Sequence, residues 1–386
     1  MRKIATLNKI SAAGLSRFTD EYTVMDDMDA AEGILVRSHD MRNMTFSNNL
    51  LAIARAGAGV NNIPVGRCSE EGIVVFNTPG ANANAVKELA ISAMLLAARN
   101  LPDALDWMKT LTDDVAREVE KGKSRFAGSE IRGKTLGIIG LGAIGVLVAN
   151  TAEKLGMKVI GHDPFITVHA AHELSNKIAM VTDMDEMLPR CDYLSIHVPS
   201  IESTKDMIDK SRFARMKKGV CFLNFSRDNL VNQEDLLDAI RAGVVKKYIT
   251  DFPNDGLLGE EGVICLPHLG ASTEEAEEVC AVMAVNQMMD YLENGNITNS
   301  VNFPSANMGH FDHTTAVARV CILNKNIPAM LRKITSVFEN INISDMINKS
   351  KGDFACTIID IDSEIDDEEL KQLLAFEGII AVRIIR

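Results

Sequence analysis

Short apolar runs alternate with longer helical patterns through most of the chain up to residue 306. The runs are rich in Val, Ile and Leu, as buried parallel strands are, and the stretches between them repeat their apolar residues at helical spacing. This alternation predicts α/β units built on parallel, doubly wound sheets. The predicted strands are 4–7, 33–37, 51–53, 73–76, 135–139, 157–160, 178–181, 193–198, 220–224, 247–251 and 263–266.

Two long helical patterns, 83–100 and 273–294, separate one group of strands from the other. We expect them to be crossovers, the second of which ends at Gly295 as its C-cap. The simplest topology inserts a Rossmann-type doubly wound parallel sheet into a smaller flavodoxin-like α/β domain. Ligands of such sheets usually lie at a joint of this kind, so an active-site cleft is expected there.

A different pattern begins near residue 316. Strands and helices follow in the order βαββαβ, with helices at 328–338 and 366–376 and a last strand at 379–385. This is the ferredoxin-like arrangement, and it predicts a separate small domain. The expected organisation is one domain from 1–95 with 285–306, a second from 96–284, a linker at 307–315 and a third from 316–386.

The stretch 134–163 reads as strand, glycine turn, helix, strand and acid without a break. Gly140, Gly142 and Gly145 have the spacing GxGxxG, which allows a tight turn, close approach to a pyrophosphate and close packing of helix on strand. A carboxylate at Asp163 would accept hydrogen bonds from ribose hydroxyls and repel a 2'-phosphate, which favours NAD over NADP. The residues expected to hold the cofactor here are Gly140, Gly142, Ala143, Ile144, Gly145 and Asp163.

The 386 residues carry a formal net charge of −13, with 46% hydrophobic and 24% charged residues. This balance is that of a globular protein, and the negative charge disfavours binding to nucleic acid. No apolar run reaches the ~18 residues that a membrane span needs, and the N-terminus reads as a strand rather than a signal peptide. The seven cysteines show no metal-ligand spacing. We therefore expect a cytoplasmic protein without a metal that acts on a small molecule.

Three loops that follow strands carry groups suited to oxidising a secondary alcohol. Arg227 offers a planar guanidinium for a carboxylate, and His268 offers an imidazole, the side chain that most often takes a hydroxyl proton in catalysis. Asp255 could hold the second ring nitrogen of His268. Each residue alone has an ordinary explanation, since a lone loop Arg is usually a solvated charge and a lone His is usually structural. Their convergence at the ends of neighbouring strands favours catalysis.

Several motifs, in the same order along the chain, resemble those of D-2-hydroxyacid dehydrogenases. They are GIIGLGAIG at 137–145, Asp163, HVP at 197–199, NFSRDNLV at 224–231, DFPND at 251–255 and CLPHLGAS at 265–272. LVRS at 35–38, ARAGAGVNNIPV at 54–65 and NTPGANANAVKELA at 77–90 are closer to the phosphoglycerate dehydrogenase branch of that family. The resemblance implies NAD-dependent oxidation of D-3-phosphoglycerate to 3-phosphohydroxypyruvate, the first step of L-serine biosynthesis.

The resemblance also implies roles for individual residues. Arg227 and His268 match catalytic residues, while Asp255 stands where the family has a Glu, with Glu260 as a substitute, and Asp228 follows Arg227 where a Gly is usual. Further cofactor contacts would fall on His197, Pro199, Ser226, Asp251 and Gly270. A phosphorylated 2-hydroxy acid would be held by Arg37, Ser38, Arg55 and the backbone of Gly59 and Val60.

The C-terminal unit resembles an ACT domain, which in this family often binds serine between copies of the chain. Asn324, Asn326 and Asn342 match its ligand loop and offer amides to L-serine, although Asn324 replaces a histidine and Ala329 a glycine. A homodimer or homotetramer is expected, and the alternative for this unit is an assembly domain with no effector. For the whole chain the alternatives are a dehydrogenase for another D-2-hydroxyacid and a catalytically weak NAD(H)-sensing regulator.

Overall fold

A computed structural model describes residues 1–386, which form two compact units. One unit consists of Met1–Asn82 together with Glu274–Arg386, and the other consists of Ala83–Thr273. The chain therefore leaves the first unit once and returns to it, as an inserted domain requires. Both breaks come earlier than the expected positions after residues 95 and 284.

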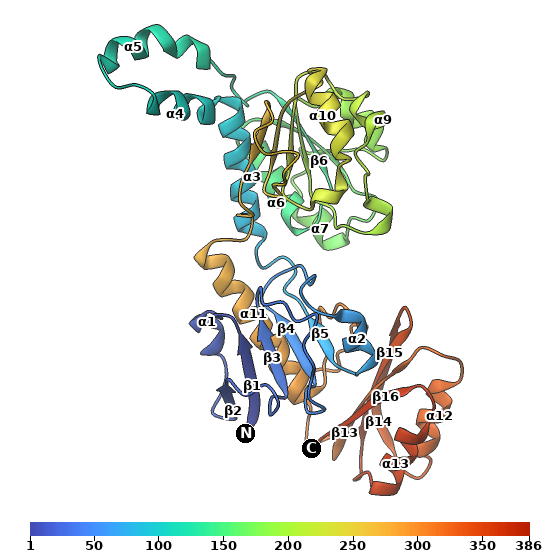
Figure 1. The fold of residues 1–386 in the computed structure, drawn as a ribbon. Helices are drawn as coiled ribbons and strands as arrows, with labels where there is room; N and C mark the ends of the chain where they lie inside the picture. Colours follow the sequence, from blue (N-terminus) through green and yellow to red (C-terminus); the bar gives the residue numbers. More distant parts are fainter. The chain divides into compact units, whose positions relative to one another are not determined.

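The first unit is built on a parallel five-stranded sheet in the order β2-β1-β3-β4-β5, which is the flavodoxin-like order. Its strands are β1 (Arg2–Leu7), β2 (Tyr22–Met25), β3 (Gly33–Val36), β4 (Ala52–Arg55) and β5 (Val74–Phe76). Helices α1 (Ala12–Leu15) and α11 (Glu274–Asn294) cover one face, and α2 (Val65–Glu70) lies on the other (Figure 1). The apolar pattern did not predict β2, because this short edge strand is only half buried.

The second unit has a parallel seven-stranded sheet in the order β12-β11-β10-β9-β6-β7-β8. This confirms the Rossmann-type order, with its switch point between β6 and β9. The strands are β6 (Thr135–Ile139), β7 (Lys158–His162), β8 (Ala179–Met180), β9 (Tyr193–Ile196), β10 (Val220–Asn224), β11 (Val245–Thr250) and β12 (Val263–Cys265). The helices packed on it are α3 (Ala83–Ala98), α6 (Ala143–Lys154), α7 (Val168–Glu173), α8 (Met184–Met187), α9 (Lys210–Phe213) and α10 (Gln233–Arg241).

α3 packs on the seven-stranded sheet and α11 on the five-stranded sheet. α3 buries Val86, Ala90 and Met94 against α6 and β10, whereas α11 buries Val285 and Met288 against β3, β4 and β5. Burying one large apolar side chain stabilises a fold by ~1.5–3 kcal/mol, and each helix buries such side chains within one unit. We therefore assign each whole helix to the unit on which it packs. The boundaries therefore fall at the N-terminal ends of the two helices rather than within them. No helix of the chain is both long and apolar enough to cross a membrane.

Helices α4 (Leu101–Lys109) and α5 (Val115–Gly122) form an arm that extends from the second unit (Figure 1). None of the residues of α4 is buried. Aromatic contacts join α4 to the segment that follows α5, because the rings of Trp107 and Phe126 lie 5.2 Å apart and the Arg125 guanidinium lies 4.9 Å from the Trp107 ring centroid. Such a cation–π contact stabilises the arm by ~0.5–1 kcal/mol at an exposed site.

The C-terminal residues form a four-stranded antiparallel sheet in the order β14-β15-β13-β16, which confirms the ferredoxin-like βαββαβ arrangement. Its elements are β13 (Ala318–Lys325), α12 (Met330–Val337), β14 (Ile343–Lys351), β15 (Phe354–Ile361), α13 (Asp367–Ala375) and β16 (Ile379–Ile385). One face packs on α12 and α13. The other face, through Leu323, Cys356 and Ile358, joins the core of the five-stranded unit. The small domain is therefore packed on the first unit.

Two arginines of this sheet hold the C-terminal end of α11. Arg319 donates from Nη1 to the carbonyl of Asn294 at 2.9 Å, and Arg383 donates from Nη1 to the carbonyl of Leu292 at 3.0 Å. Arg319 is 1% exposed and forms a two-pronged ion pair with Asp360, at 2.6 and 2.8 Å. Guanidinium groups at this position satisfy free helix carbonyls and oppose the negative end of the helix dipole.

In the structure α12 begins at Met330, whereas the sequence pattern places the start of the helix at Pro328. The cause is Ala329, which adopts φ +67°. A left-handed conformation brings Cβ close to the following carbonyl and costs ~1–2 kcal/mol in any residue other than glycine. The turn before α12 therefore holds local strain.

We predict that Ala329→Gly raises the melting temperature of the full chain by about 2 °C, because relief of this strain exceeds the added freedom of the unfolded chain. Thermal unfolding followed by circular dichroism measures it. Ala116→Gly, on an exposed turn of α5, is the control and should lower the melting temperature. A melting temperature of Ala329→Gly at or below that of the parent chain would contradict the assignment of strain.

Candidate active site

The glycine turn lies between β6 and the first turn of α6. Gly140 has φ +91°, and a Cβ there would lie 2.6 Å from the carbonyl oxygen of His197, so a side chain is excluded. A Cβ on Gly145 would overlap the carbonyl oxygen of Gly140. Gly142 faces open space, and the N-terminus of α6 has no side-chain cap. The turn therefore leaves the positive end of the α6 dipole free to receive an anion.

Asp163 follows β7 and lies beside the same turn. Its Oδ2 accepts the N–H of Leu141 at 2.8 Å, and its Oδ1 accepts the N–H of Phe165 at 2.8 Å. The half-buried carboxylate thus ties the turn to the end of β7, while each oxygen keeps a lone pair for a further donor. A carboxylate so placed can accept hydrogen bonds from ribose hydroxyls.

Strand register brings the ends of β10, β11 and β12 side by side. Asn224 pairs with Thr250, and Thr250 pairs with Cys265, so the three strands end in line. The loops that leave these ends carry the arginine and the histidine that the sequence singles out. Parallel strands release their loops at one edge of the sheet, which is why the order of the motifs was enough to predict this grouping.

Asp251 is the buried acid at the carboxyl end of β11, with 1% of its surface exposed. Its Oδ2 accepts the N–H of Gly270 at 2.8 Å, and its main-chain carbonyl accepts the N–H of His268 at 3.1 Å. Burial raises the pKa of Asp251, while the Gly270 N–H and the charges of His268 and Arg227 oppose that rise. Its Oδ1 is enclosed and has no hydrogen-bond partner. Asp251 therefore ties the loop after β12 to the end of β11 and leaves one acceptor for a donor from outside the chain.

His268 is exposed and has φ +51°, a strained conformation for a residue with a side chain. Its ring packs on Phe252, with the ring centroids 5.0 Å apart and the planes at 53°. Neither Asp255 nor Glu260, both exposed, hydrogen-bonds to the ring. The sequence did not single out Phe252, and only its place next to Asp251 could have indicated it.

Arg227 is partly exposed and lies in the loop after β10. Its Nη1 donates to the carbonyl of Ser226 at 2.6 Å, and the buried Asn224 donates from Nδ2 to the carbonyl of Arg227 at 2.8 Å. The Ser226 hydroxyl in turn donates to the carbonyl of Ile196 at 2.8 Å. The ends of β9 and β10 thus hold this loop, and the guanidinium keeps further N–H groups for a ligand.

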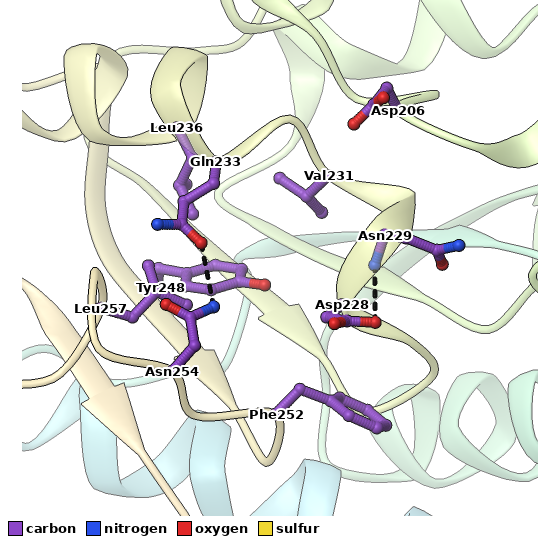
Figure 2. A pocket seen from close by; sticks show the side chains of 10 residues that line it. All are labelled: Asp206, Asp228, Asn229, Val231, Gln233, Leu236, Tyr248, Phe252, Asn254 and Leu257. Atoms are coloured by element: carbon purple, nitrogen blue, oxygen red, sulfur yellow. Dashed lines mark hydrogen bonds between the residues drawn. The ribbon is translucent and has the colours of Figure 1, made fainter.

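A cavity of about 220 Å³ opens beside the turn that follows Arg227 (Figure 2). Its lining residues are Asp206, Asp228, Asn229, Val231, Gln233, Leu236, Tyr248, Phe252, Asn254 and Leu257. Asp228 accepts the N–H of Asn229 at 2.9 Å, so its carboxylate is used in the turn and does not pair with Arg227. Asn254 donates to Gln233 at 2.9 Å and so anchors the loop that carries Asp255 (Figure 2).

His197 and Pro199 follow β9. The Nε2 atom of His197 is hydrogen-bonded to the Ser195 hydroxyl at 2.9 Å, while its Nδ1 is enclosed without a partner. Burial lowers the pKa of His197 to about 4, because desolvation disfavours the imidazolium, so the ring is neutral near pH 7. Pro199 is exposed, and its carbonyl accepts the Thr204 hydroxyl at 2.7 Å. The loop after β9 thus packs against the glycine turn at Gly140.

The residues expected to hold the substrate belong to the first compact unit. Arg55, at the end of β4, donates from Nε to the carbonyl of Arg37 at 2.9 Å. Arg37, which follows β3, forms an ion pair of 2.6 Å with Glu277 in the first turn of α11. The sequence did not single out Glu277, because its place among several acids near the start of the helix is what any helix N-terminus favours.

Ser38 and the segment Gly59–Val60 lie in the loops after β3 and β4 of the same unit. The N–H of Ser38 donates to Oδ1 of Asn8 at 3.0 Å. Gly59 and Val60 are partly exposed, and Asn77 donates from Nδ2 to the neighbouring carbonyl of Ala58 at 2.6 Å. The side chains of Asn8 and Asn77 therefore hold the two loops.

The three asparagines expected to bind an effector are not hydrogen-bonded to one another. Asn324, 1% exposed, donates from Nδ2 to the carbonyl of Lys325 at 2.8 Å, and Asn326 donates to the carbonyl of Gly352 at 3.0 Å. Asn342 is exposed before β14. The enclosed Oδ1 of Asn324 has no partner and is left as an acceptor.

The residues of the second unit fit a dinucleotide. The uncapped N-terminus of α6 suits a pyrophosphate, and the Asp163 carboxylate suits the hydroxyls of a ribose. The enclosed Oδ1 of Asp251 lacks a donor, which the amide of a nicotinamide ring would supply. These three groups lie on the glycine turn, after β7 and after β11.

Comparison with known proteins places the chain in a family. Residues 91–270 match the family described as D-isomer specific 2-hydroxyacid dehydrogenase, NAD binding domain. The chain is 30% identical over 375 residues to the D-3-phosphoglycerate dehydrogenase of Haemophilus influenzae, which covers 92% of this chain and 86% of that protein. It is 35% identical over 291 residues to the D-3-phosphoglycerate dehydrogenase of Archaeoglobus fulgidus, covering 73% and 53% of the two chains. The chain spans about half the length of the archaeal relatives that it matches.

A solved structure gives the same result. The NAD⁺-bound 3-phosphoglycerate dehydrogenase of Entamoeba histolytica superposes with a TM-score of 0.62 at 26% identity, over 78% of this chain and 98% of that one. The NAD-binding match at 91–270 lies within the second compact unit, Ala83–Thr273, which is the unit that holds the glycine turn. The chain therefore belongs to the D-isomer specific 2-hydroxyacid dehydrogenase family.

Proposed function

We propose that this chain oxidises D-3-phosphoglycerate to 3-phosphohydroxypyruvate with NAD as the hydride acceptor, in the first step of L-serine biosynthesis. The supporting observation is the grouping of Arg227 and His268 around the buried Asp251, in a chain that aligns along 92% of its length with a D-3-phosphoglycerate dehydrogenase. A carboxylate-binding guanidinium beside an imidazole base is what oxidation of a 2-hydroxy acid requires.

In this reaction Arg227 binds the carboxylate and orients the hydroxyl of the substrate. His268 takes the hydroxyl proton, and the neighbouring negative charge of Asp251 stabilises the imidazolium that forms. NAD, when bound, supplies the nicotinamide ring that accepts the hydride. Asp251 Oδ1 would accept a hydrogen bond from the carboxamide of that ring. Asp255 is the proposed partner of His268, once the loop 252–262 moves inward on substrate binding.

The first unit would supply the remaining substrate contacts. The main-chain N–H groups of Gly59 and Val60 would hold the carboxylate, and the guanidiniums of Arg37 and Arg55, with Ser38, would hold the phosphate. On this basis residues 1–82 and 274–306 form a substrate-binding domain, and 83–273 form an NAD-binding domain. Residues 316–386 form an ACT-like domain.

The ACT-like domain is proposed to bind L-serine through Asn324, Asn326 and Asn342 between copies of a homodimer or homotetramer. The enclosed Oδ1 of Asn324 supports this, because an amino group would satisfy it. A cytoplasmic location is proposed because all seven cysteines are free thiols, as a reducing compartment favours.

We predict that His268→Asn lowers kcat for the reduction of 3-phosphohydroxypyruvate by roughly 10²–10⁴-fold, because the acid–base group is lost. The KM for NADH should change little. Steady-state loss of NADH absorbance measures both constants. His169→Asn, on the exposed surface of α7, is the matched control and should keep the parent kcat. A His268→Asn variant that retains more than about a tenth of the parent kcat would contradict the assigned role.

We predict that Asp163→Asn raises the KM for NADH roughly tenfold, because a neutral amide makes weaker hydrogen bonds to ribose hydroxyls than a carboxylate does. The KM for NADPH should fall, since the negative charge that repels a 2'-phosphate is gone. The amide oxygen can still accept one of the two main-chain N–H groups that the carboxylate holds. Unchanged constants for both cofactors would remove Asp163 from the cofactor site.

A second candidate function is a catalytically weak NAD(H)-sensing regulator. The observation that favours it is the absence of a carboxylate hydrogen-bonded to the ring of His268. An imidazole base without such a partner forms a less stable imidazolium during the reaction. Tight NADH binding in calorimetry, without turnover of any 2-oxo acid, would establish the regulator.

We predict that Asp255→Asn lowers kcat roughly 10- to 100-fold and that Glu260→Gln leaves it unchanged. Loss of the carboxylate removes the charge that would stabilise the imidazolium formed in alcohol oxidation, so kcat/KM should fall across the pH range. Profiles of kcat/KM measured on the two variants decide between the acids. If Glu260→Gln lowers kcat and Asp255→Asn does not, Glu260 is the partner of His268. Parent kinetics in both variants would show that His268 works without either carboxylate.

A further inference from the structure

Two cations and one carboxylate meet at the ends of β3 and β4 in the first unit. Nη2 of Arg37 lies 2.6 Å from Oε1 of Glu277, and both side chains are partly exposed, at 38% and 40%. Arg55 lies at the same strand ends, because its Nε donates to the carbonyl of Arg37. The charges of all three residues act on the pKa of the buried thiol of Cys280, three residues further along α11. They therefore occupy one small region.

This cluster has an excess of one positive charge in a chain whose net charge is −13. The Arg55 guanidinium packs on Gly57, where a Cβ would come within 2.8 Å of Nη1. Two guanidinium groups at the ends of neighbouring parallel strands suit an anion with several oxygens. Glu277, however, already occupies one edge of the Arg37 guanidinium.

We propose that Glu277 is a gate on this anion site: its carboxylate holds Arg37 in the free protein and is displaced by a phosphoryl dianion. This inference rests on the proposed function and extends it to the choice between phosphorylated and unphosphorylated substrates. A hydroxyl group cannot replace a carboxylate on a guanidinium, and a second carboxylate only exchanges one single charge for another. A phosphate brings nearly two charges and three acceptor oxygens. Glu277 is thus a positioning residue that acts through Arg37.

A gate and a purely structural role predict opposite effects of removing Glu277 on the binding of phosphate. If Glu277 only held Arg37 in a useful orientation, its removal would weaken the binding of phosphate. If Glu277 competes with phosphate for the same guanidinium, its removal strengthens that binding. Because the ion pair is exposed to solvent, the competition is modest, and substrate phosphate can overcome it.

We predict that Glu277→Gln lowers the KM for 3-phosphohydroxypyruvate by about two- to fivefold. The KM for hydroxypyruvate, which has no phosphate, should move no more than it does in the control. The control is Glu278→Gln, an exposed neighbour on α11 whose replacement removes the same charge. This control distinguishes the effect of releasing Arg37 from the effect of removing one negative charge. A KM for the phosphorylated substrate that rises, or that falls equally in both variants, would overturn the gate.

Two further measurements complete the test. In an Arg37→Ala background, Glu277→Gln should produce no additional change in KM, and a full change there would show that Glu277 does not act through Arg37. Calorimetry of the full chain with inorganic phosphate should give a lower Kd for Glu277→Gln than for the parent and for Glu278→Gln. An unchanged Kd rejects the gate. Failure of the proposed function would appear separately, as absence of turnover of 3-phosphohydroxypyruvate in the parent chain.

Discussion

The hydrogen bond from the Gly270 N–H to the buried Asp251 carboxylate is the constraint on which the candidate active site depends. It ties the loop after β12 to the end of β11, and the main-chain bond from His268 to Asp251 adds a second tie. A buried carboxylate is costly to desolvate, and this donor with the charges of His268 and Arg227 offsets part of that cost. The same group therefore holds the loop after β12 and contributes to the electrostatics of the proposed base.

Helix α11 plays the corresponding part in the first unit. Its first turn carries Glu277, which pairs with Arg37, and its last carbonyls are held by Arg319 and Arg383 of the C-terminal sheet. A helix of 21 residues spans about 30 Å, so one rigid element joins the cluster of Arg37, Arg55 and Glu277 to the C-terminal sheet. That domain shares a hydrophobic core with the five-stranded sheet. The proposed substrate cations and the C-terminal sheet thus belong to one continuous body.

Much of the fold could be predicted because buried parallel strands are nearly continuous apolar runs, as β6 and β10 are. The strand β2 was missed, since a half-buried edge strand lacks that signal. The unit boundaries were displaced because periodicity shows which face of a helix is buried but not which sheet buries it. For α3 and α11 that neighbour is fixed only by tertiary packing.

The residues of the candidate site likewise divide into those that the sequence indicates and those that only the structure shows. The glycine turn and Asp163 could be found because their spacing is local in the chain. The contacts of Phe252 with His268 and of Glu277 with Arg37 have no local signal, because they depend on loop conformation and on residues far apart in the sequence. The enclosed acceptor of Asp251 is likewise visible only once burial is known.

The proposed substrate of this chain is a phosphorylated 2-hydroxy acid. The most direct test of this proposal is the ratio of kcat/KM for 3-phosphohydroxypyruvate to that for hydroxypyruvate, measured with NADH on the parent chain. Charge-assisted contacts from two guanidinium groups to a phosphate should make this ratio about 100 or greater. A ratio near one, or no turnover of the phosphorylated compound, would contradict the account.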